Sequence, residues 1–175
     1  SLSKNPGYIR IFSNPNIIED RKQFSVLGFR QKESDFEYSV KMTFDPKKDK
    51  VESGIVHYQK EYNFISSTVV KEKKKYYLSL TLGESDKDPK HLKRIKLTNY
   101  SGNIIFKTIS KNDKYTFHFS LDGGNTFENY GECDASVMLS RNYTGALLGL
   151  YITSNDRKTK EYADYDWVKY RGYLR

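Results

Sequence analysis

The 175 residues are 37 % hydrophobic and 15 % aromatic and carry a formal net charge of +8, which suits one domain with a buried core over residues 1–175. The single cysteine, Cys133, excludes an internal disulfide, and no group of Cys and His residues has the spacing of a metal site. There is neither a signal-peptide pattern nor a run of eighteen apolar residues, so no membrane partner is expected, and the cellular compartment is left open.

Alternation of apolar and polar residues predicts short β-strands along the whole chain, and fifteen Tyr and ten Phe support this because aromatic residues favour strands. In chain order the predicted strands are Tyr8–Phe12, Phe24–Gln31, Phe36–Phe44, Ser53–Gln59, Tyr62–Val70, Tyr76–Leu82, Leu92–Leu97, Ile104–Ile109, Tyr115–Leu121, Thr126–Tyr130, Gly145–Thr153 and Tyr162–Tyr170. One helical turn is expected at Asp134–Ser140, with Asp134 as its N-cap. This pattern predicts an all-β fold, a two-sheet antiparallel β-sandwich of jelly-roll type.

The last two predicted strands differ in their pattern. Gly145–Thr153 is almost continuously apolar, which is typical of a central strand buried on both faces. Tyr162–Tyr170 alternates, as a strand with one wet face does, and we expect it to be the antiparallel partner of the first. The only tryptophan, Trp167, is expected to anchor the core.

Lysine-rich segments at Lys71–Lys75 and Lys87–Lys96 are a candidate phosphate-binding stripe. The alternative is a solvated turn followed by a strand whose lysines protect a sheet edge from pairing with other chains. Acidic residues interrupt the lysines, and no known nucleic-acid motif accompanies them. We therefore favour the second interpretation and expect no nucleic-acid partner.

The segment Ser120–Phe127, SLDGGNTF, fits the Asp-box pattern S-x-D-x-G-x-T-F of sialidase-like propellers. In such a segment an aspartate carboxylate accepts hydrogen bonds from the backbone of a tight hairpin, and glycines take positive φ angles. Propellers carry several copies, whereas this chain has one. The motif therefore predicts a stabilised hairpin and not a catalytic site.

Acid catalysis of glycoside hydrolysis needs two carboxylates facing each other across a pocket. Asp164 and Asp166 lie two residues apart on one face of the last predicted strand, where they could form a carboxylate pair or part of a structural calcium site. The alternative is that one supports a turn and the other faces solvent. No third acid is implicated by spacing, so we assign no catalytic residue and expect no cofactor, with structural calcium left open.

A second candidate site is the strand pair around Ser53–Phe64, where His57, Gln59 and Tyr62 could bind a glycan through stacking and hydrogen bonds. Ordinary sheet packing is the alternative. The three histidines, His57, His91 and His118, are spread singly along strands, which favours half-buried filler over ligands or bases.

A series of short motifs in family order then indicates a resemblance. The motifs are Gly7–Arg10, Arg30-Gln31, Asp35–Glu37, Phe44–Pro46, Ser53–Tyr58, Phe119–Gly123, Asp134–Ser136, Leu139-Ser140, Tyr143–Ala146, Leu148–Leu150 and Ala163–Trp167. Together they resemble the C-terminal concanavalin A-like β-sandwich of the family-43 β-xylosidases and α-arabinofuranosidases. The most specific part is T-G-A-x-x-G followed by A-D-Y-D-W.

The resemblance implies that a catalytic five-bladed propeller is the partner of this domain and holds the catalytic carboxylates. It implies that the loop Ser140–Tyr143 closes the sugar pocket, with Tyr143 or Asn142 as the lid residue, and that the substrate derives from xylan or arabinan. This loop is shorter than in many related enzymes, and Asn142 stands where the first of two aromatic residues would be. We therefore expect a non-catalytic accessory domain. The alternatives are a free-standing carbohydrate-binding module and a pure scaffold.

Overall fold

The computed structural model describes residues 8–13, 25–30, 34–60, 63–83, 90–134, 147–155 and 160–173, without the side chains of 25–30 and 60. Within these residues the chain forms twelve strands and no helix. None of them belongs to a helix that is long and apolar enough to cross a bilayer.

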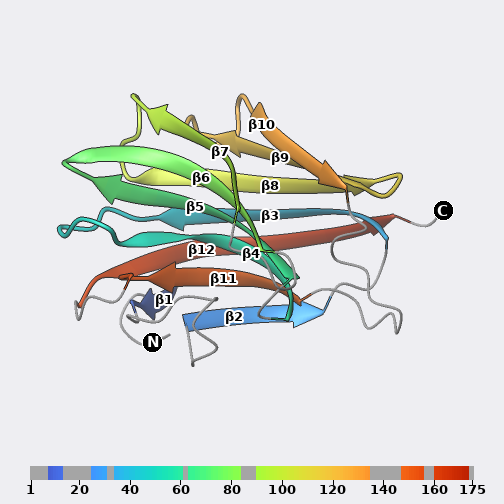
Figure 1. Ribbon diagram of the computed structural model, residues 1–175, viewed down its shortest axis with the longest axis horizontal. Coiled ribbons are helices and arrows are strands. Elements are labelled where there is room, and N and C mark those ends of the chain that lie inside the picture. The colour runs from blue at the N-terminus through green and yellow to red at the C-terminus, as the bar shows by residue number, and fades with distance from the viewer. Residues whose placement is uncertain are drawn as a thin grey trace.

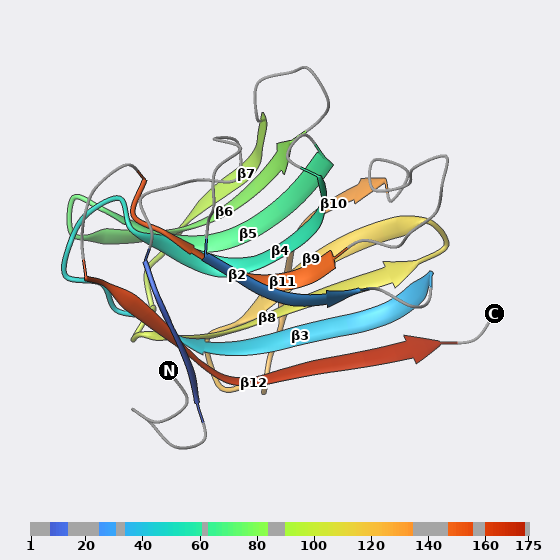
Figure 2. The same cartoon turned by 90° about the horizontal axis from the view of Figure 1, so that it is seen from below.

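The strands form two six-stranded antiparallel sheets that face each other (Figures 1 and 2). Sheet A contains, in spatial order, β1 (Ile9–Phe12), β12 (Tyr162–Tyr173), β3 (Asp35–Thr43), β8 (Asn103–Lys111), β9 (Lys114–Ser120) and β10 (Glu128–Asp134). Sheet B contains β2 (Ser25–Arg30), β11 (Leu147–Thr153), β4 (Glu52–Lys60), β5 (Asn63–Glu72), β6 (Lys75–Gly83) and β7 (Lys90–Leu97). The predicted all-β sandwich is confirmed.

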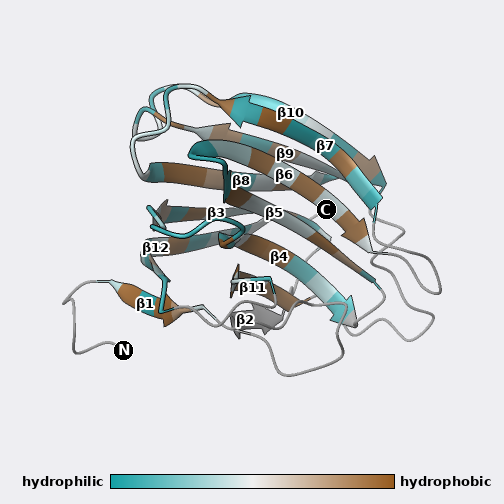
Figure 3. Ribbon diagram, turned by 60° about the vertical axis from the view of Figure 1, so that its left-hand side comes forward, coloured by the Kyte–Doolittle hydropathy of each residue, from teal (hydrophilic) through white to brown (hydrophobic). Residues whose placement is uncertain are grey.

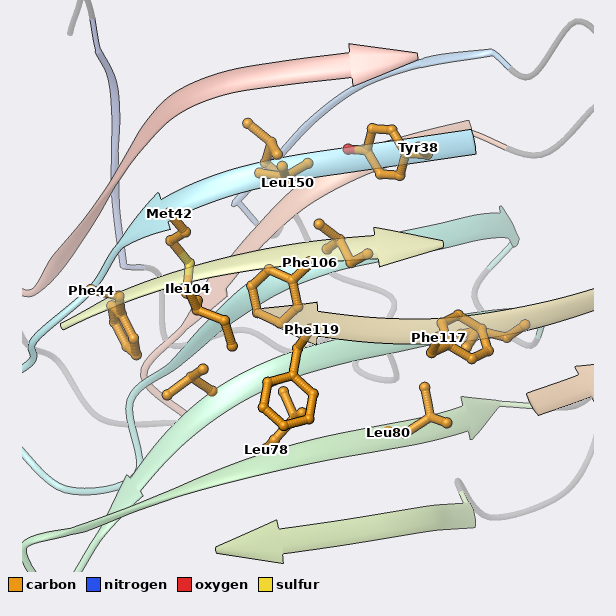
Figure 4. Packing of buried hydrophobic residues seen from close by; sticks show 14 of the residues in the cluster. Tyr38, Met42, Phe44, Leu78, Leu80, Ile104, Phe106, Phe117, Phe119 and Leu150 are labelled. Carbon is orange, nitrogen blue, oxygen red and sulfur yellow. The ribbon is translucent and has the colours of Figure 1, made fainter. Parts of the chain in front are cut away.

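The hydrophobic core fills the space between the sheets. The alternation predicted for β3 is observed: Phe36, Tyr38, Val40 and Met42 are fully buried, and the residues between them are half-buried. Figure 3 shows the same alternation of hydrophobic and hydrophilic residues along several strands. Figure 4 shows side chains from β3, β8 and β9 pointing into one layer with Leu78 and Leu80 of β6 and Leu150 of β11.

Strand positions agree with the sequence pattern apart from one strand. The strand expected at Thr126–Tyr130 is β10, which begins at Glu128 and continues to Asp134. Asp134, expected to cap a helical turn, therefore ends a strand, where its neighbour Cys133 pairs with Tyr115 of β9. The rest of the expected helical turn lies outside the described residues.

The pairing predicted for the last two strands is wrong. β11 lies in sheet B between β2 and β4, whereas β12 lies in sheet A between β1 and β3. The chain between them thus passes from one sheet to the other. The burial prediction for β11 is confirmed, since six of its seven residues are buried.

A β-bulge between Tyr165 and Trp167 changes which residues of β12 face the core. Before the bulge, Ala163 and Tyr165 point inward and are almost fully buried. The extra residue shifts the alternation by one position, so that Val168 packs against the core. Trp167, expected in the core, instead pairs with Lys41 and is half-exposed on the outer face of sheet A.

The lysine-rich segments form a turn and an edge strand, as the second interpretation of them predicted. Lys73 and Lys74 make the turn between β5 and β6 with φ angles of 48° and 65°. β7, with the sequence KHLKRIKL, pairs only with β6 and forms one edge of sheet B, and most of its polar side chains are exposed. Charged side chains on a strand whose outer edge is unpaired disfavour pairing of that edge with another chain.

Hydrogen bonds between buried side chains join the two sheets across the core. The hydroxyl oxygen of Tyr165 lies 2.5 Å from Ser53 Oγ and 3.1 Å from the carbonyl oxygen of Tyr151, both in sheet B. The Tyr38 hydroxyl donates to the carbonyl oxygen of Gly149 at 3.3 Å. The Tyr165 hydroxyl also lies 3.3 Å from the carbonyl oxygen of Gly54. Two contacts between side chains join Tyr130 to Ser67 and, at 2.9 Å, His57 Nε2 to Thr108 Oγ1.

Burial raises the pKa of Tyr38, Tyr130 and Tyr165 above the ordinary tyrosine value, so these phenols stay neutral. Neutral hydroxyls are suited to the core, because an ionised group there would lose its hydration. These inter-sheet hydrogen bonds should therefore add to the stability of the sandwich.

The substitution Tyr165→Phe should lower the free energy of unfolding by about 1 to 2 kcal/mol, because it removes a buried hydrogen-bond donor and leaves its partners less well satisfied. Urea unfolding followed by the fluorescence of Trp167 measures the change. The control is Tyr173→Phe, which removes a hydroxyl from a side chain that is 39 % exposed and should change stability by less than about 0.5 kcal/mol. Equal losses for both variants would contradict the proposed contribution of the buried hydrogen bonds.

Candidate functional site

One end of the sandwich carries His57 and Gln59, the two described residues of the predicted glycan-binding set, near the end of β4. There β11 begins at Leu147, which pairs with Tyr58 near the end of β4. On the facing sheet the turn between β8 and β9 and the end of β12 lie at the same end, to the right in Figure 1. The predicted lid residues Asn142 and Tyr143 lie outside the described residues, which resume at Leu147, the first residue of β11.

Of the predicted glycan-binding residues, the structure describes His57 and Gln59, which differ in exposure. His57 is 1 % exposed and points into the core between the sheets, so it cannot contact a sugar at the surface. It lies on β4 between Val56 and Tyr58, and all three belong to an apolar run that gives no clear alternation. Gln59 is half-buried and accepts a hydrogen bond from the Asn63 side chain at 3.1 Å. Tyr62 lies outside the described residues.

His57 is an internal side chain surrounded by aromatic rings. It stacks on Tyr115 with ring centroids 5.4 Å apart and touches Phe36, Tyr38 and Phe117. Its Nε2 contacts Thr108, and its Nδ1 makes no hydrogen bond with the described part of the chain. Burial lowers the pKa of His57 to about 3, so the ring is neutral at physiological pH. The prediction of a filler is supported, and its burial is complete rather than partial.

Asp164 and Asp166 each have a cationic partner of their own. Arg10 Nε and Nη2 contact the two carboxylate oxygens of Asp164 at 2.7 and 2.8 Å, and Asp164 is 7 % exposed. Lys41 Nζ lies 3.4 Å from Asp166. Both carboxylates therefore have a role without a metal ion. Across the described ranges no group of three or more His, Cys, Asp or Glu residues is placed to hold one.

The Asp-box-like segment forms a hydrogen-bonded turn, as predicted. Asp122 accepts hydrogen bonds from the backbone and side chain of Thr126 at 2.9 and 2.5 Å and from the Ser120 hydroxyl at 2.7 Å. These contacts, those of Thr126 first, lower the pKa of Asp122 to about 2. Gly123 and Gly124 adopt φ angles of 75° and 98°. Three hydrogen bonds, two to Oδ1 and one to Oδ2, tie this carboxylate to the turn, so it acts in structure.

A surface pocket that the sequence did not predict lies at the same end of the sandwich. It has a volume of about 360 Å³ and is lined by Asp35, Glu37, Ile109, Ser110, Lys111 and Tyr173. The Tyr173 hydroxyl donates to Glu37 Oε2 at 3.3 Å, and the backbone N–H of Asn112 donates to Asp35 Oδ1 at 3.3 Å. Carboxylates, a hydroxyl and an aromatic ring form a lining suited to binding a polar ligand.

Sequence reasoning missed this pocket because its lining comes from β3, β8 and β12, which are distant in the sequence and adjacent only in sheet A. The motif Asp35–Glu37 was a signal for part of it. Nothing in the local sequence indicates that Tyr173 lies opposite Asp35, as the register of β12 and β3 shows.

Comparison with known proteins identifies the family. The model of the β-xylosidase C-terminal concanavalin A-like domain, which belongs to glycoside hydrolase family 43, matches residues 1–171. The chain belongs to this family. The resemblance inferred from the short motifs is thereby confirmed, and the two-sheet sandwich is the concanavalin A-like fold.

Relatives of this family 43 domain are longer proteins. A xylosidase/arabinosidase of Butyrivibrio fibrisolvens is 30 % identical over an alignment of 174 residues that covers 95 % of this chain and 32 % of that protein. The family-43 protein BlXynB of Bacillus licheniformis has the same fold with a TM-score of 0.88, at 23 % identity over 99 % of this chain and 34 % of that one. A xylan β-1,4-xylosidase of Bacillus halodurans gives 0.85 at 20 % identity, over 98 % and 34 %. The chain spans about a third of the length of these proteins.

The buried His57 should make the domain less stable as the pH falls below neutral. Its pKa is about 3 in the folded state and about 6.5 in an unfolded chain. Between these values the unfolded state binds more protons, so stability is complete above pH 6.5 and decreases as the pH falls, by up to about 1.4 kcal/mol per pH unit.

Urea unfolding between pH 4 and 7 tests this prediction with the variant His57→Gln, which cannot titrate. The variant should show a weaker dependence on pH than the original chain, whatever its absolute stability. The control is His91→Gln, which changes an exposed histidine on β7. An unchanged pH dependence in His57→Gln would show that the buried ring is not responsible.

Proposed function

We propose that this chain is the non-catalytic accessory domain of a family 43 glycoside hydrolase that acts on xylosides or arabinosides. The observation that carries this proposal is the family match over residues 1–171, combined with the small share of each relative that the chain covers. About two thirds of each of these relatives lies outside this domain, which leaves room for a separate catalytic unit.

In this proposal the domain packs against a five-bladed propeller that holds the catalytic carboxylates. Two of the acids with described contacts support such a division. Asp122 accepts hydrogen bonds that hold a turn, and Asp164 is occupied by Arg10. Glycoside hydrolysis needs one carboxylic acid that donates a proton and one free carboxylate across a pocket, and neither of these residues is free for that role.

The proposed contribution to the reaction is closure of the sugar pocket by Asn142 or Tyr143. These residues precede β11, which is fixed between β2 and β4 and buried from Leu148 onward. A loop attached to such a strand starts from a rigid support. An aromatic side chain placed there would exclude water from the pocket, which strengthens electrostatic interactions with the bond that is cleaved.

The 175-residue chain alone should release no 4-nitrophenol from 4-nitrophenyl β-D-xyloside or α-L-arabinofuranoside, because the catalytic carboxylates belong to another domain. Absorbance at several enzyme concentrations measures this, with a complete family 43 xylosidase as the positive control. Release that rises in proportion to the concentration of this chain would overturn the accessory role.

The lid role predicts that Tyr143→Ala lowers kcat/KM on the order of tenfold when the domain is joined to its catalytic domain. Tyr143→Phe keeps the ring and should retain most of the activity, and Asn142→Ala tests the second lid candidate. The measurement is steady-state hydrolysis of xylobiose. If Tyr143→Ala and Asn142→Ala both leave kcat/KM unchanged, these residues do not close the pocket.

A free-standing carbohydrate-binding module is the second candidate function. It is favoured by the paired amides of Gln59 and Asn63 beside the half-buried Tyr58 at the end of β4. Side-chain amides donate and accept hydrogen bonds and so suit sugar hydroxyls. Gln59→Ala should weaken glycan binding if this site on sheet B is used, and should leave it unchanged if the glycan binds to sheet A.

A further inference from the structure

The exposed aromatic side chains of the described residues lie on β12 and on its neighbour β1. Three large hydrophobic side chains of the described residues are exposed: Phe12 at 40 %, Tyr162 at 43 % and Tyr173 at 39 %. Two of them lie on β12, and Phe12 lies on its neighbour β1, directly opposite Tyr162. With the half-exposed Trp167 between them, they form what we call the β12 aromatic stripe: Tyr162, Trp167 and Tyr173, with Phe12 beside Tyr162.

The β-bulge of β12 puts Trp167 and Tyr173 on the same outer face of sheet A as Tyr162, which precedes the bulge. Tyr162 points outward because its neighbour Ala163 points into the core. Beyond the bulge, Trp167 lies opposite Lys41 and Tyr173 lies opposite Asp35. At a rise of about 3.3 Å per residue, Trp167 and Tyr173 are about 20 Å apart. In Figure 2 β12 lies beside β3 in sheet A, at the bottom of the view.

Charges of both signs lie along the stripe. Arg10 is paired with Asp164, and Lys41 is paired with Asp166. The exposed Lys169 and Arg171 have no such ion pair within the described part of the chain, but the carboxylates of Asp35 and Glu37 lie on the same face and offset their charge. The face therefore carries little net charge and favours an uncharged ligand, whereas a nucleic-acid surface carries an excess of cations.

Each aromatic ring of the stripe also has a cation close to it. Arg10 lies 3.9 Å from the centroid of Tyr162, Lys169 lies 4.3 Å from that of Trp167, and Arg171 lies 5.2 Å from that of Tyr173. At exposed sites such contacts contribute only about 0.5 to 1 kcal/mol. A ligand that stacks on Trp167 or Tyr173 can therefore displace Lys169 or Arg171, whereas Arg10 is held in place by Asp164.

The stripe ends at the pocket described above, because Tyr173 belongs to both. Beyond the ring, Asp35 and Glu37 offer carboxylate oxygens as hydrogen-bond acceptors, and Lys111 offers a donor. Rings for stacking, followed by a cavity with acceptors and a donor, match a ligand that is apolar on its ring faces and rich in hydroxyl groups. A sugar chain has this chemistry.

We propose that the outer face of β12 binds an extended, uncharged polysaccharide. Sugar rings stack on Trp167 and Tyr173, and the hydroxyl groups of one sugar bind in the pocket. The site lies on sheet A, whereas Gln59 lies on sheet B. The proposal does not depend on the accessory role, since glycan binding can be present or absent whether or not a catalytic domain adjoins this one.

Isothermal titration calorimetry of the 175-residue chain with xylohexaose, arabinohexaose and cellohexaose tests the proposal. At least one of them should give saturable heat, and oligogalacturonate, which is charged, should bind more weakly. Trp167→Ala and Tyr173→Ala should each weaken binding about tenfold or more, a loss of about 1.4 kcal/mol. Both side chains are partly exposed, so a melting temperature close to that of the original chain verifies folding.

The matched control is Tyr77→Ala, which removes an aromatic ring that also carries a cation, Arg94 at 4.5 Å, but lies on sheet B. It should leave the affinity unchanged. The proposal is overturned if no neutral oligosaccharide binds, if oligogalacturonate binds most tightly, or if Gln59→Ala abolishes binding while Trp167→Ala does not. It is also overturned if sedimentation shows a dimer that Trp167→Ala dissociates, since the stripe would then bind a second copy.

Discussion

The hydrogen bonds that cross the core between the two sheets are the constraint on which this sandwich depends. A core rich in tyrosine must give each phenol hydroxyl a partner, because an unsatisfied buried polar group is costly. Tyr38 and Tyr165 meet this requirement by reaching backbone carbonyl oxygens of the facing sheet. Apolar contacts alone would allow the sheets to slide, whereas these bonds hold specific residues opposite one another.

This registration positions the functional parts of the molecule. Tyr38 of β3 bonds to Gly149 and Tyr165 of β12 bonds to Tyr151, so β11 is held against two strands of sheet A. β11 follows Asn142 and Tyr143, for which the lid role is proposed, and β12 carries most of the aromatic stripe. The same two tyrosines therefore fix the relative positions of both proposed surfaces, on different sheets of one rigid body.

The sequence was sufficient to predict the fold class and the positions of nearly all strands, because alternation along segments such as Phe36–Phe44 is a local property. It could not show that β11 and β12 belong to different sheets, because no local pattern states which strand pairs with which. The sequence also did not predict that Trp167 lies outside the core or that His57 is completely buried. A bulge reversed the alternation at Trp167, and the residues around His57 show no alternation that indicates which of them face the core. The pocket at Tyr173 required the full register of three strands.

The lysine-rich edge of sheet B affects how the domain behaves in concentrated solution. An open strand edge is a template for aggregation, and β7 presents Lys90, Lys93 and Lys96 along such an edge. Repulsion between like charges on approaching molecules acts over about 10 Å at an ionic strength of 0.1 M and over a shorter range in stronger salt. The resistance of this edge to pairing with another chain thus depends on electrostatic repulsion, and it should decline as counterions screen the lysines of β7.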